Sequence, residues 1–146
     1  MTTVNVYLTF NGNCEEAFTF YKSVFGGEFP YVGRFSEMPP QEGMPPIDEK
    51  DKHLIMHISL PIGGDTILMG SDSVGEWAQG LQKGTNFSIS INTDTKEEAD
   101  RIFAQLSKGG KVTMPLHDSF WNAYFGMFTD KFGIQWMINV NLEEKK

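Results

Sequence analysis

The sequence has few of the features that place a protein outside the cytosol. It contains one cysteine, Cys14, so no disulfide can form within the chain and nothing in it depends on an oxidising compartment. No apolar run approaches the roughly 20 residues that a membrane-spanning helix needs. The first residues, Met1 to Val4, lack the basic and apolar regions of a signal peptide. We therefore expect a cytoplasmic protein that is neither secreted by that route nor embedded in a membrane.

Basic residues are also scarce. Twelve lysines and arginines stand against nineteen aspartates and glutamates, which gives a net charge of −7. A surface with this balance repels the phosphate backbone of nucleic acids and anionic membranes. The longest basic cluster is the pair Lys145-Lys146, with no aromatic residues interleaved. Nucleic acid and membranes are therefore not expected partners.

The apolar content, in contrast, is that of an ordinary globular protein. Hydrophobic residues make up 40% of the 146 residues and charged residues 21%. A chain of this length and composition buries a substantial core without disulfides or metal ions to hold it together. We expect one domain with a packed core.

The first half of the chain begins with a strand pattern followed by a helix pattern. Apolar and polar residues alternate from Val4 to Phe10, which is typical of a half-buried strand. Helical spacing follows over residues 14–25, where Asn13 and Glu16 resemble a capping box and Gly26-Gly27 is a typical helix end. Further strands are predicted over His53–Leu60 and Asp65–Gly70, and a less distinct one near Glu28–Ser36.

The same order repeats from Asn86 onward. A strand pattern leads to a second capping box from Thr95 to Glu98, a helix pattern, and a second glycine pair, Gly109-Gly110. The tripeptide Glu-Glu-Ala opens both helices, and three more strands are predicted near residues 111–118, 121–129 and 134–141. This repeat predicts a single domain made of two βαβββ modules, at about residues 1–72 and 84–142.

The two copies differ mainly between Glu37 and Lys52. This segment holds four of the seven prolines of the chain among charged residues. A long segment of this kind is either a lid over a site or a connector without a role. The sequence leaves both alternatives open.

Several stretches of the sequence are similar to one family: Phe10–Ala17, Ile55–His57, Met69–Asp72, Gly109–Pro115, and the segment from Phe120-Trp121 to Trp136-Met137. Together with the repeated module, they resemble the PhnB-like branch of the vicinal-oxygen-chelate superfamily. That superfamily includes glyoxalase I, extradiol dioxygenases, and the fosfomycin and bleomycin resistance proteins. The resemblance covers nearly the whole chain. It implies an α+β fold in which two βαβββ modules form curved sheets around a cup with helices on the outer face, and it implies a homodimer.

Proteins of this branch also carry the name of a demethylubiquinone methyltransferase-like domain. A methyltransferase that uses S-adenosylmethionine would usually show a glycine-rich turn between a strand and a helix, with an acidic residue at the end of the next strand. The sequence contains no such turn. The resemblance therefore implies the name and not the activity.

The resemblance also implies where a metal would bind. Metal-using members of the superfamily carry histidine or glutamate ligands on the first and last strands of the modules, and the matching positions here are about Asn5, Met69, Asn86 and Met137. None is a histidine or a carboxylate. Because zinc, nickel and iron ions prefer imidazole, carboxylate or thiolate ligands, we predict no metal site and no cofactor.

The remaining reactive side chains do not replace those ligands. His53 and His57 are four residues apart, which on a strand is about 13 Å at roughly 3.3 Å per residue, so they cannot share one ion. His117 and Asp118 are adjacent on a predicted strand and point to opposite faces. Cys14 lies in the first turn of a predicted helix, where the dipole can lower a thiol pKa. A structural role is favoured for Cys14 over that of a nucleophile.

The strand patterns also predict which residues line the cup. If the apolar strand faces contact the helices, the opposite faces carry neutral polar groups and one soft apolar residue. His57 is either a hydrogen-bonding group of the cup or an ordinary histidine of a sheet face. An aromatic-rich segment between Trp121 and Trp136 either adds stacking surface or belongs to the core and a dimer contact. The predicted lining comprises Asn5, Tyr7, Thr9, His57, Asn86, Ser88, Ser90, Gln135, Met137 and Asn139.

Such a lining suits hydrogen bonds to a small organic molecule that is uncharged or weakly charged. The favoured hypothesis is a metal-independent protein that binds a small molecule. The alternative is an enzyme of the lyase, isomerase or dioxygenase kind, which acts through side chains such as His57 and Tyr7 or through an unrecognised metal site. A third hypothesis is a domain that associates mainly with another protein. The catalytic residues and the ligand are not specified by the sequence.

Overall fold

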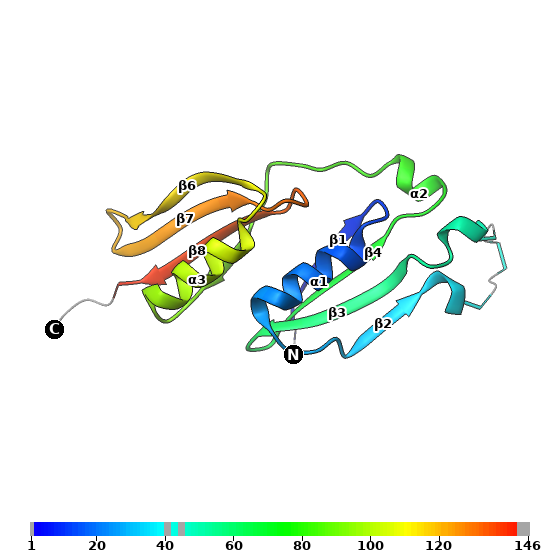
Figure 1. Cartoon of the computed structure of the whole chain (residues 1–146), viewed down its shortest axis with the longest axis horizontal. Coiled ribbons are helices and arrows are strands. Elements are labelled where there is room, and N and C mark those ends of the chain that lie inside the picture. The colour runs from blue at the N-terminus through cyan, green and yellow to red at the C-terminus, as the bar shows by residue number, and fades with distance from the viewer. Residues whose placement is uncertain (1, 40–41, 44–45, 143–146) are drawn as a thin grey trace. The chain divides into compact units, whose positions relative to one another are not determined.

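The computed structural model of the chain describes residues 2–39, 42–43 and 46–142. The chain forms two compact units, Met1–Gln82 and Lys83–Lys146. Each unit is a four-stranded sheet with one α-helix packed on one face (Figure 1). The predicted α+β fold with two βαβββ modules is therefore confirmed. The cup between the modules and the single-domain organisation stay predictions.

The first unit contains one complete βαβββ module. Its sheet has the order β1-β4-β3-β2, with β1 parallel to β4 and the other pairs antiparallel. The weakly indicated strand near Glu28–Ser36 is confirmed as the edge strand β2. The elements are β1 (Val6–Phe10), α1 (Cys14–Phe25), β2 (Tyr31–Arg34), the 3-10 turns η1 (Phe35–Glu37) and η2 (Glu49–Asp51), β3 (Ile55–Gly63) and β4 (Thr66–Asp72).

The core of the first unit lies between α1 and one face of the sheet. Leu8, Ile58 and Leu68 are buried on three adjacent strands, opposite the buried helix residues Phe18 and Tyr21. Gly70 of β4 allows the helix to approach closely. A Cβ atom at this position would lie 2.8 Å from the Leu8 carbonyl oxygen and 2.7 Å from the Phe18 ring. The apolar residues of the alternating sequence pattern therefore face this core, and the residues between them face the opposite, open side of the sheet.

The second unit repeats the same topology, with the sheet order β5-β8-β7-β6. Its buried helix residues Ile102 and Leu106 are on the covered side, together with Trp136, Ile138 and Val140 of β8. The strand predicted to begin at Asn86 is shorter than expected, because β5 begins at Ile89. The elements are β5 (Ile89–Asn92), α3 (Lys96–Leu106), β6 (Lys111–Asp118), β7 (Ala123–Thr129) and β8 (Gln135–Asn141). The short helix α2 (Glu76–Gln79) precedes them and belongs to the first unit.

The two helix starts differ from each other. Thr95 behaves as predicted, since its Oγ1 accepts a hydrogen bond from the Glu98 amide at 3.1 Å. The capping box predicted at Asn13 is wrong, because the Asn13 side chain makes no cap hydrogen bond. The amides of Gly12 and Cys14 instead donate to Asp72 Oδ1, both at 2.9 Å. A carboxylate from the end of β4 therefore caps α1, which sequence spacing could not indicate.

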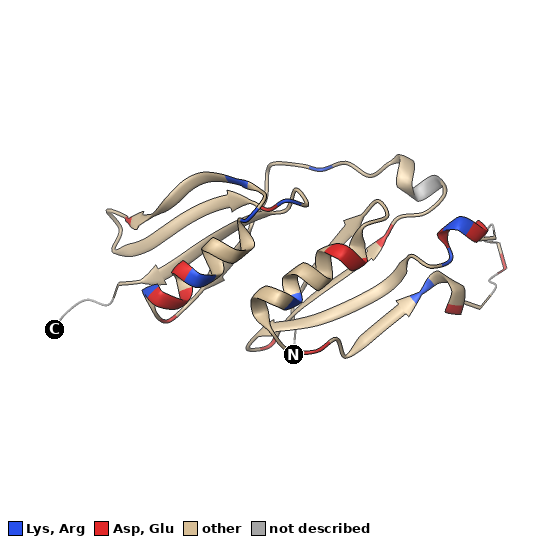
Figure 2. Ribbon diagram, in the orientation of Figure 1, with Lys and Arg blue, Asp and Glu red and all other residues tan. Residues whose placement is uncertain are grey.

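The strands carry little charge between their ends, whereas the helices and the connections are charged (Figure 2). The segment from Glu37 to Lys52 is described only in part, since residues 40, 41, 44 and 45 lie outside the described residues. Whether it is a lid stays a prediction. No helix in the described part of the chain is long and apolar enough to cross a membrane.

Candidate functional site

The open face of the first sheet carries the residues that alternate with its core. Tyr7 is in register with Met69, Met69 with Ser59, and Ser59 with Tyr31, which forms one row across all four strands. Thr9 and Ser71 are paired on the neighbouring row. Because α1 covers the opposite face, these side chains project from the uncovered side. All of them are uncharged.

His57 of β3 lies between two tyrosines on this face. The Tyr7 hydroxyl is 3.4 Å from His57 Nδ1, and the two ring centroids are 5.6 Å apart. The Tyr31 ring approaches His57 from the other side, with a centroid separation of 5.7 Å. The tyrosines are 47% and 49% exposed, so both rings and the imidazole remain accessible to a ligand. We call this group the Tyr-His-Tyr cluster.

Gly33 of β2 leaves room for the Tyr31 ring. A Cβ atom on Gly33 would lie 2.6 Å from the Tyr31 hydroxyl oxygen and 2.9 Å from its ring. Gly33 is paired with His57 in the sheet. The missing side chain therefore lets Tyr31 lean along its own strand toward the histidine.

The sequence predicted two members of this cluster and missed the third. Tyr7 and His57, fifty residues apart, lie close together in the sheet, and their role in ligand binding stays a prediction. Asn5 precedes β1 and uses its Oδ1 to accept the Ile67 amide at 3.0 Å. Tyr31 was missed because its strand was indistinct in the sequence. The sequence signals that could have indicated Tyr31 were its alternation with Val32 and its position two residues before Gly33.

The other predicted lining residues lie in the second unit. Asn86 and Ser88 precede β5 and are not strand residues, contrary to the predicted strand start. The Gln135 amide donates to the Phe87 carbonyl at 2.6 Å, and the Asn139 amide donates to Asn92 Oδ1 at 3.1 Å. Met137 is paired with Ser90 and Met127. How these residues lie relative to the Tyr-His-Tyr cluster stays a prediction.

The aromatic segment of the second unit divides between core and surface. Phe128, Phe132 and Trp136 are buried, as the core interpretation predicts. Trp121 is 49% exposed and contacts Phe125 edge to face at 5.4 Å. Tyr124 donates a hydrogen bond to Asp100 at 2.6 Å, which raises the pKa of its hydroxyl to about 12. Part of this segment therefore belongs to the core, and whether its exposed part adds stacking surface for a ligand stays a prediction.

Cys14 is fully buried at the start of α1. Burial raises the pKa of its thiol well above the ordinary value, and the nearby Asp72 carboxylate raises it further. These effects outweigh the helix dipole, which would lower the pKa. The structural role predicted for Cys14 fits this environment, because a nucleophile requires an accessible thiolate.

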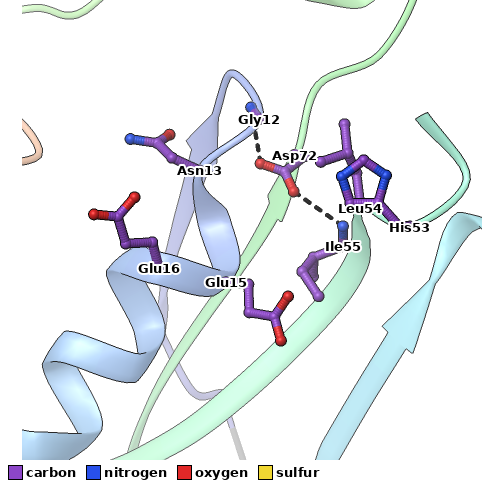
Figure 3. Close-up of a pocket in the computed structure, with 8 residues that line it drawn as sticks. All are labelled: Gly12, Asn13, Glu15, Glu16, His53, Leu54, Ile55 and Asp72. Carbon is purple, nitrogen blue, oxygen red and sulfur yellow. Dashed lines mark hydrogen bonds between the residues drawn. The ribbon is translucent and has the colours of Figure 1, made fainter. Parts of the chain in front are cut away.

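A pocket of about 340 Å³ opens beside the same helix start (Figure 3). Arg34 donates to both carboxylate oxygens of Glu15, at 3.0 and 2.8 Å, and these bonds hold the pKa of Glu15 below its ordinary value. A helix N-terminus normally attracts anions. Here the amides of Gly12 and Cys14 already donate to Asp72, so they are not available to an anionic ligand. The pocket is lined by Gly12, Asn13, Glu15, Glu16, His53, Leu54, Ile55 and Asp72.

A family model described as the Glyoxalase/Bleomycin resistance protein/Dioxygenase superfamily matches residues 3–138, which is almost the whole chain. The chain belongs to this superfamily. Within it, Protein YjdN of Escherichia coli (strain K12) is 35% identical over 139 residues, which cover 92% of each chain.

Two solved structures of similar proteins support the PhnB-like placement. Protein PA1353 from Pseudomonas aeruginosa is 39% identical, with a TM-score of 0.80 over 97% of this chain and 98% of that chain. The PhnB protein from Bacillus cereus, described as a putative 3-demethylubiquinone-9 3-methyltransferase, is 26% identical, with a TM-score of 0.73 over 95% and 99% of the two chains. This superfamily member is thus homologous to YjdN and PhnB.

The metal site implied for the superfamily does not fit the residues present. Asn5 already accepts a backbone hydrogen bond, Met69 and Met137 offer thioethers, and Asn86 offers an amide. These groups are poor ligands for zinc, nickel or iron. In the described ranges, no three histidine, cysteine, aspartate or glutamate side chains gather in a way that could hold an ion.

Proposed function

We propose that this superfamily member binds a small, uncharged or weakly charged aromatic molecule on the open face of its first sheet, without a metal ion. The observation that supports the proposal is the Tyr-His-Tyr cluster. The two tyrosines offer half-exposed rings for edge-to-face or offset stacking, and the imidazole between them can either donate or accept a hydrogen bond.

The surroundings of the cluster favour a ligand without full charges. The neighbouring positions on the face, Thr9, Ser59, Met69 and Ser71, are neutral. A charged ligand would lose part of its hydration there without gaining an ion-pair partner from these residues. A ring with one hydroxyl or ring nitrogen would instead gain stacking contacts and a hydrogen bond. Binding needs nothing further from the protein, whereas the hypothesis of an enzyme needs groups that we do not identify.

The proposal predicts that His57→Leu weakens the binding of p-cresol, a neutral phenol used as a probe. Leucine cannot form the hydrogen bond, which contributes about 0.5–1.5 kcal/mol, so we expect the dissociation constant to rise by up to about tenfold. The measurement is saturation-transfer NMR with a titration of p-cresol. His53→Leu is the matched control, because His53 is an exposed histidine just before β3. Equal weakening by the two substitutions, or none by His57→Leu, would refute the assignment.

Gly33→Ala tests the geometry of the same cluster. The new methyl group collides with the Tyr31 side chain and not with the backbone, so the ring must move while the sheet persists. Binding of p-cresol should weaken although no ligand-binding group is removed. Unchanged binding together with a displaced Tyr31 resonance would show that Tyr31 does not take part.

Metal independence is tested by repeating the p-cresol titration on protein dialysed against EDTA and then against buffer. We expect the same dissociation constant before and after dialysis, because no amide or thioether of the implied site holds a divalent ion strongly. Loss of binding that Zn²⁺, Ni²⁺, Mn²⁺ or Fe²⁺ restores would contradict the proposal and direct attention to enzyme assays. The proposal also includes the cytoplasmic location expected from the sequence and the homodimer that the family resemblance implies. Light scattering tests the homodimer, and a measured mass equal to that of one chain would contradict it.

A further inference from the structure

Three methionines lie side by side on the open face of the second sheet. Met114 of β6 is in register with Met127 of β7, and Met127 is in register with Met137 of β8. Adjacent strands are about 4.8 Å apart, so Met114 and Met137 lie one strand away from Met127 on its two sides. Met114 is 37% exposed and the other two are half-buried. We call these residues the methionine row.

The direction of the methionine row follows from its neighbours. Met137 alternates with Trp136 and Ile138, which are buried on the side of α3. Met127 likewise lies between the buried residues Gly126 and Phe128. The thioethers of Met127 and Met137 therefore project from the face that α3 leaves uncovered. Met114 of β6 is paired with Met127, and the register of β6 shifts on both sides of Met114.

His117 lies beside the methionine row on the same face. It is in register with Phe125, two residues before Met127 on β7. The next pair on these strands is Asp118 with Tyr124, and both of its members bind residues of α3 on the covered side. His117 consequently projects from the open face.

The ring of His117 is oriented by the backbone. Its Nδ1 lies 2.9 Å from the Pro115 carbonyl oxygen. Because a carbonyl only accepts hydrogen bonds, Nδ1 carries the proton and Nε2 of the neutral ring keeps a free lone pair. Histidines that bind metals are usually held in this way, with the other ring nitrogen donating to a carbonyl or carboxylate.

We propose that the methionine row and Nε2 of His117 form a binding site for a soft monovalent cation, Cu(I) or Ag(I). Thioethers are soft, uncharged ligands that select Cu(I) over Zn²⁺, Mg²⁺ or Ca²⁺. Methionine has three rotatable bonds, which let neighbouring sulfur atoms converge on one ion. The sequence predicted no metal site because zinc, nickel and iron ions prefer imidazole, carboxylate or thiolate ligands. That prediction does not extend to an ion that prefers sulfur.

This proposal rests on different residues from those of the proposed small-molecule site. Its four ligand residues all belong to the second unit, whereas the Tyr-His-Tyr cluster belongs to the first. Either proposal can therefore fail while the other holds.

The test uses Ag(I), which has the same charge as Cu(I) and is stable in air. Full-length protein with ¹³C-labelled methionine methyl groups and ¹⁵N-labelled histidine is titrated with silver nitrate in chloride-free buffer. Ag(I) also binds thiols, so the titration is done in a Cys14→Ala background that circular dichroism shows to be folded. The chain has eight methionines. The methyl resonances of Met114, Met127 and Met137 should shift together and saturate at one equivalent, together with the His117 Nε2 resonance. Shifts spread over other methionines, or none at all, would overturn the proposal.

The matched variants are Met127→Leu and Met56→Leu. Leucine conserves the volume of methionine, so the fold should persist. Loss of a side chain that only holds a metal ligand in place costs about 10–100-fold in metal affinity. Removal of Met127, which is itself the central ligand, should therefore weaken Ag(I) binding by at least about tenfold. Met56 is a half-buried methionine of the first unit and its replacement should have no effect. Equal effects of the two substitutions, or a similar response of the protein to Zn²⁺, would show that no thioether site exists.

Discussion

Replacement of Asp72 with alanine should destabilise the first unit by about 3–5 kcal/mol, because three backbone amides would lose their acceptor at once. Asp72 is only 4% exposed. It accepts from Gly12 and Cys14 through Oδ1 and from Ile55 through Oδ2, each at 2.9 Å. It thus fixes the start of α1 and the start of β3 to the end of β4. A negative charge at this helix start also interacts favourably with the helix dipole.

Native-state hydrogen exchange is the appropriate measurement, since it reads each compact unit separately. The amides of β3 and β4 should lose protection in Asp72→Ala, while those of the second unit should not change. Asp65→Ala is the matched control, because Asp65 is exposed in the turn between β3 and β4. Asp72→Asn keeps one acceptor oxygen but cannot accept from Ile55 through its amide nitrogen, and its effect should be intermediate. A loss of less than about 1 kcal/mol in Asp72→Ala would contradict this assignment.

Trp136→Ala should have an effect of similar size in the second unit. Trp136 is fully buried and is the largest such side chain in the described part of the protein. Truncation of a buried tryptophan costs about 3–5 kcal/mol, because it removes apolar contacts and leaves a cavity. The Trp136 indole also donates to Asp130 Oδ2 at 2.9 Å, and Asp130 accepts from the amides of Phe132 and Ile134. The substitution therefore also removes one donor from a carboxylate that is 3% exposed.

Two further variants separate the contributions of packing and hydrogen bonding. Trp136→Phe keeps most of the apolar volume and loses the N–H group, so it should cost about 1–3 kcal/mol. Trp121→Ala is the control for the size of the truncation, since Trp121 is 49% exposed and its loss should cost less than about 1 kcal/mol. The free energy of unfolding is measured by denaturant titration, and hydrogen exchange of the β7 and β8 amides then shows whether the loss lies in the second unit. Equal costs for Trp121→Ala and Trp136→Ala would contradict the assigned core.

The two buried aspartates show how far sequence reasoning extends to the fold. The alternation from Val4 to Phe10, the helical spacing and the Glu-Glu-Ala repeat predicted the modules because these signals are local. The roles of Asp72 and Asp130 were not predicted. Asp72 caps a helix that begins nearly sixty residues earlier, and no spacing rule connects a helix start with the end of a distant strand. The Asn13 capping box was wrong, and the local pattern gave no sign that the distant Asp72 binds the neighbouring amides of Gly12 and Cys14.

The candidate site shows the same division. Strand alternation determined which face Tyr7 and Met137 occupy, because successive side chains on a strand point to opposite faces. The residue types alone determined that the superfamily's implied divalent metal site lacks its ligands. Only the tertiary structure decided which residues meet: Tyr31 joins Tyr7 and His57, and three methionines from three strands form one row. The reason is that strand order and register bring together residues far apart in the chain, through backbone pairing that leaves no local trace in the sequence.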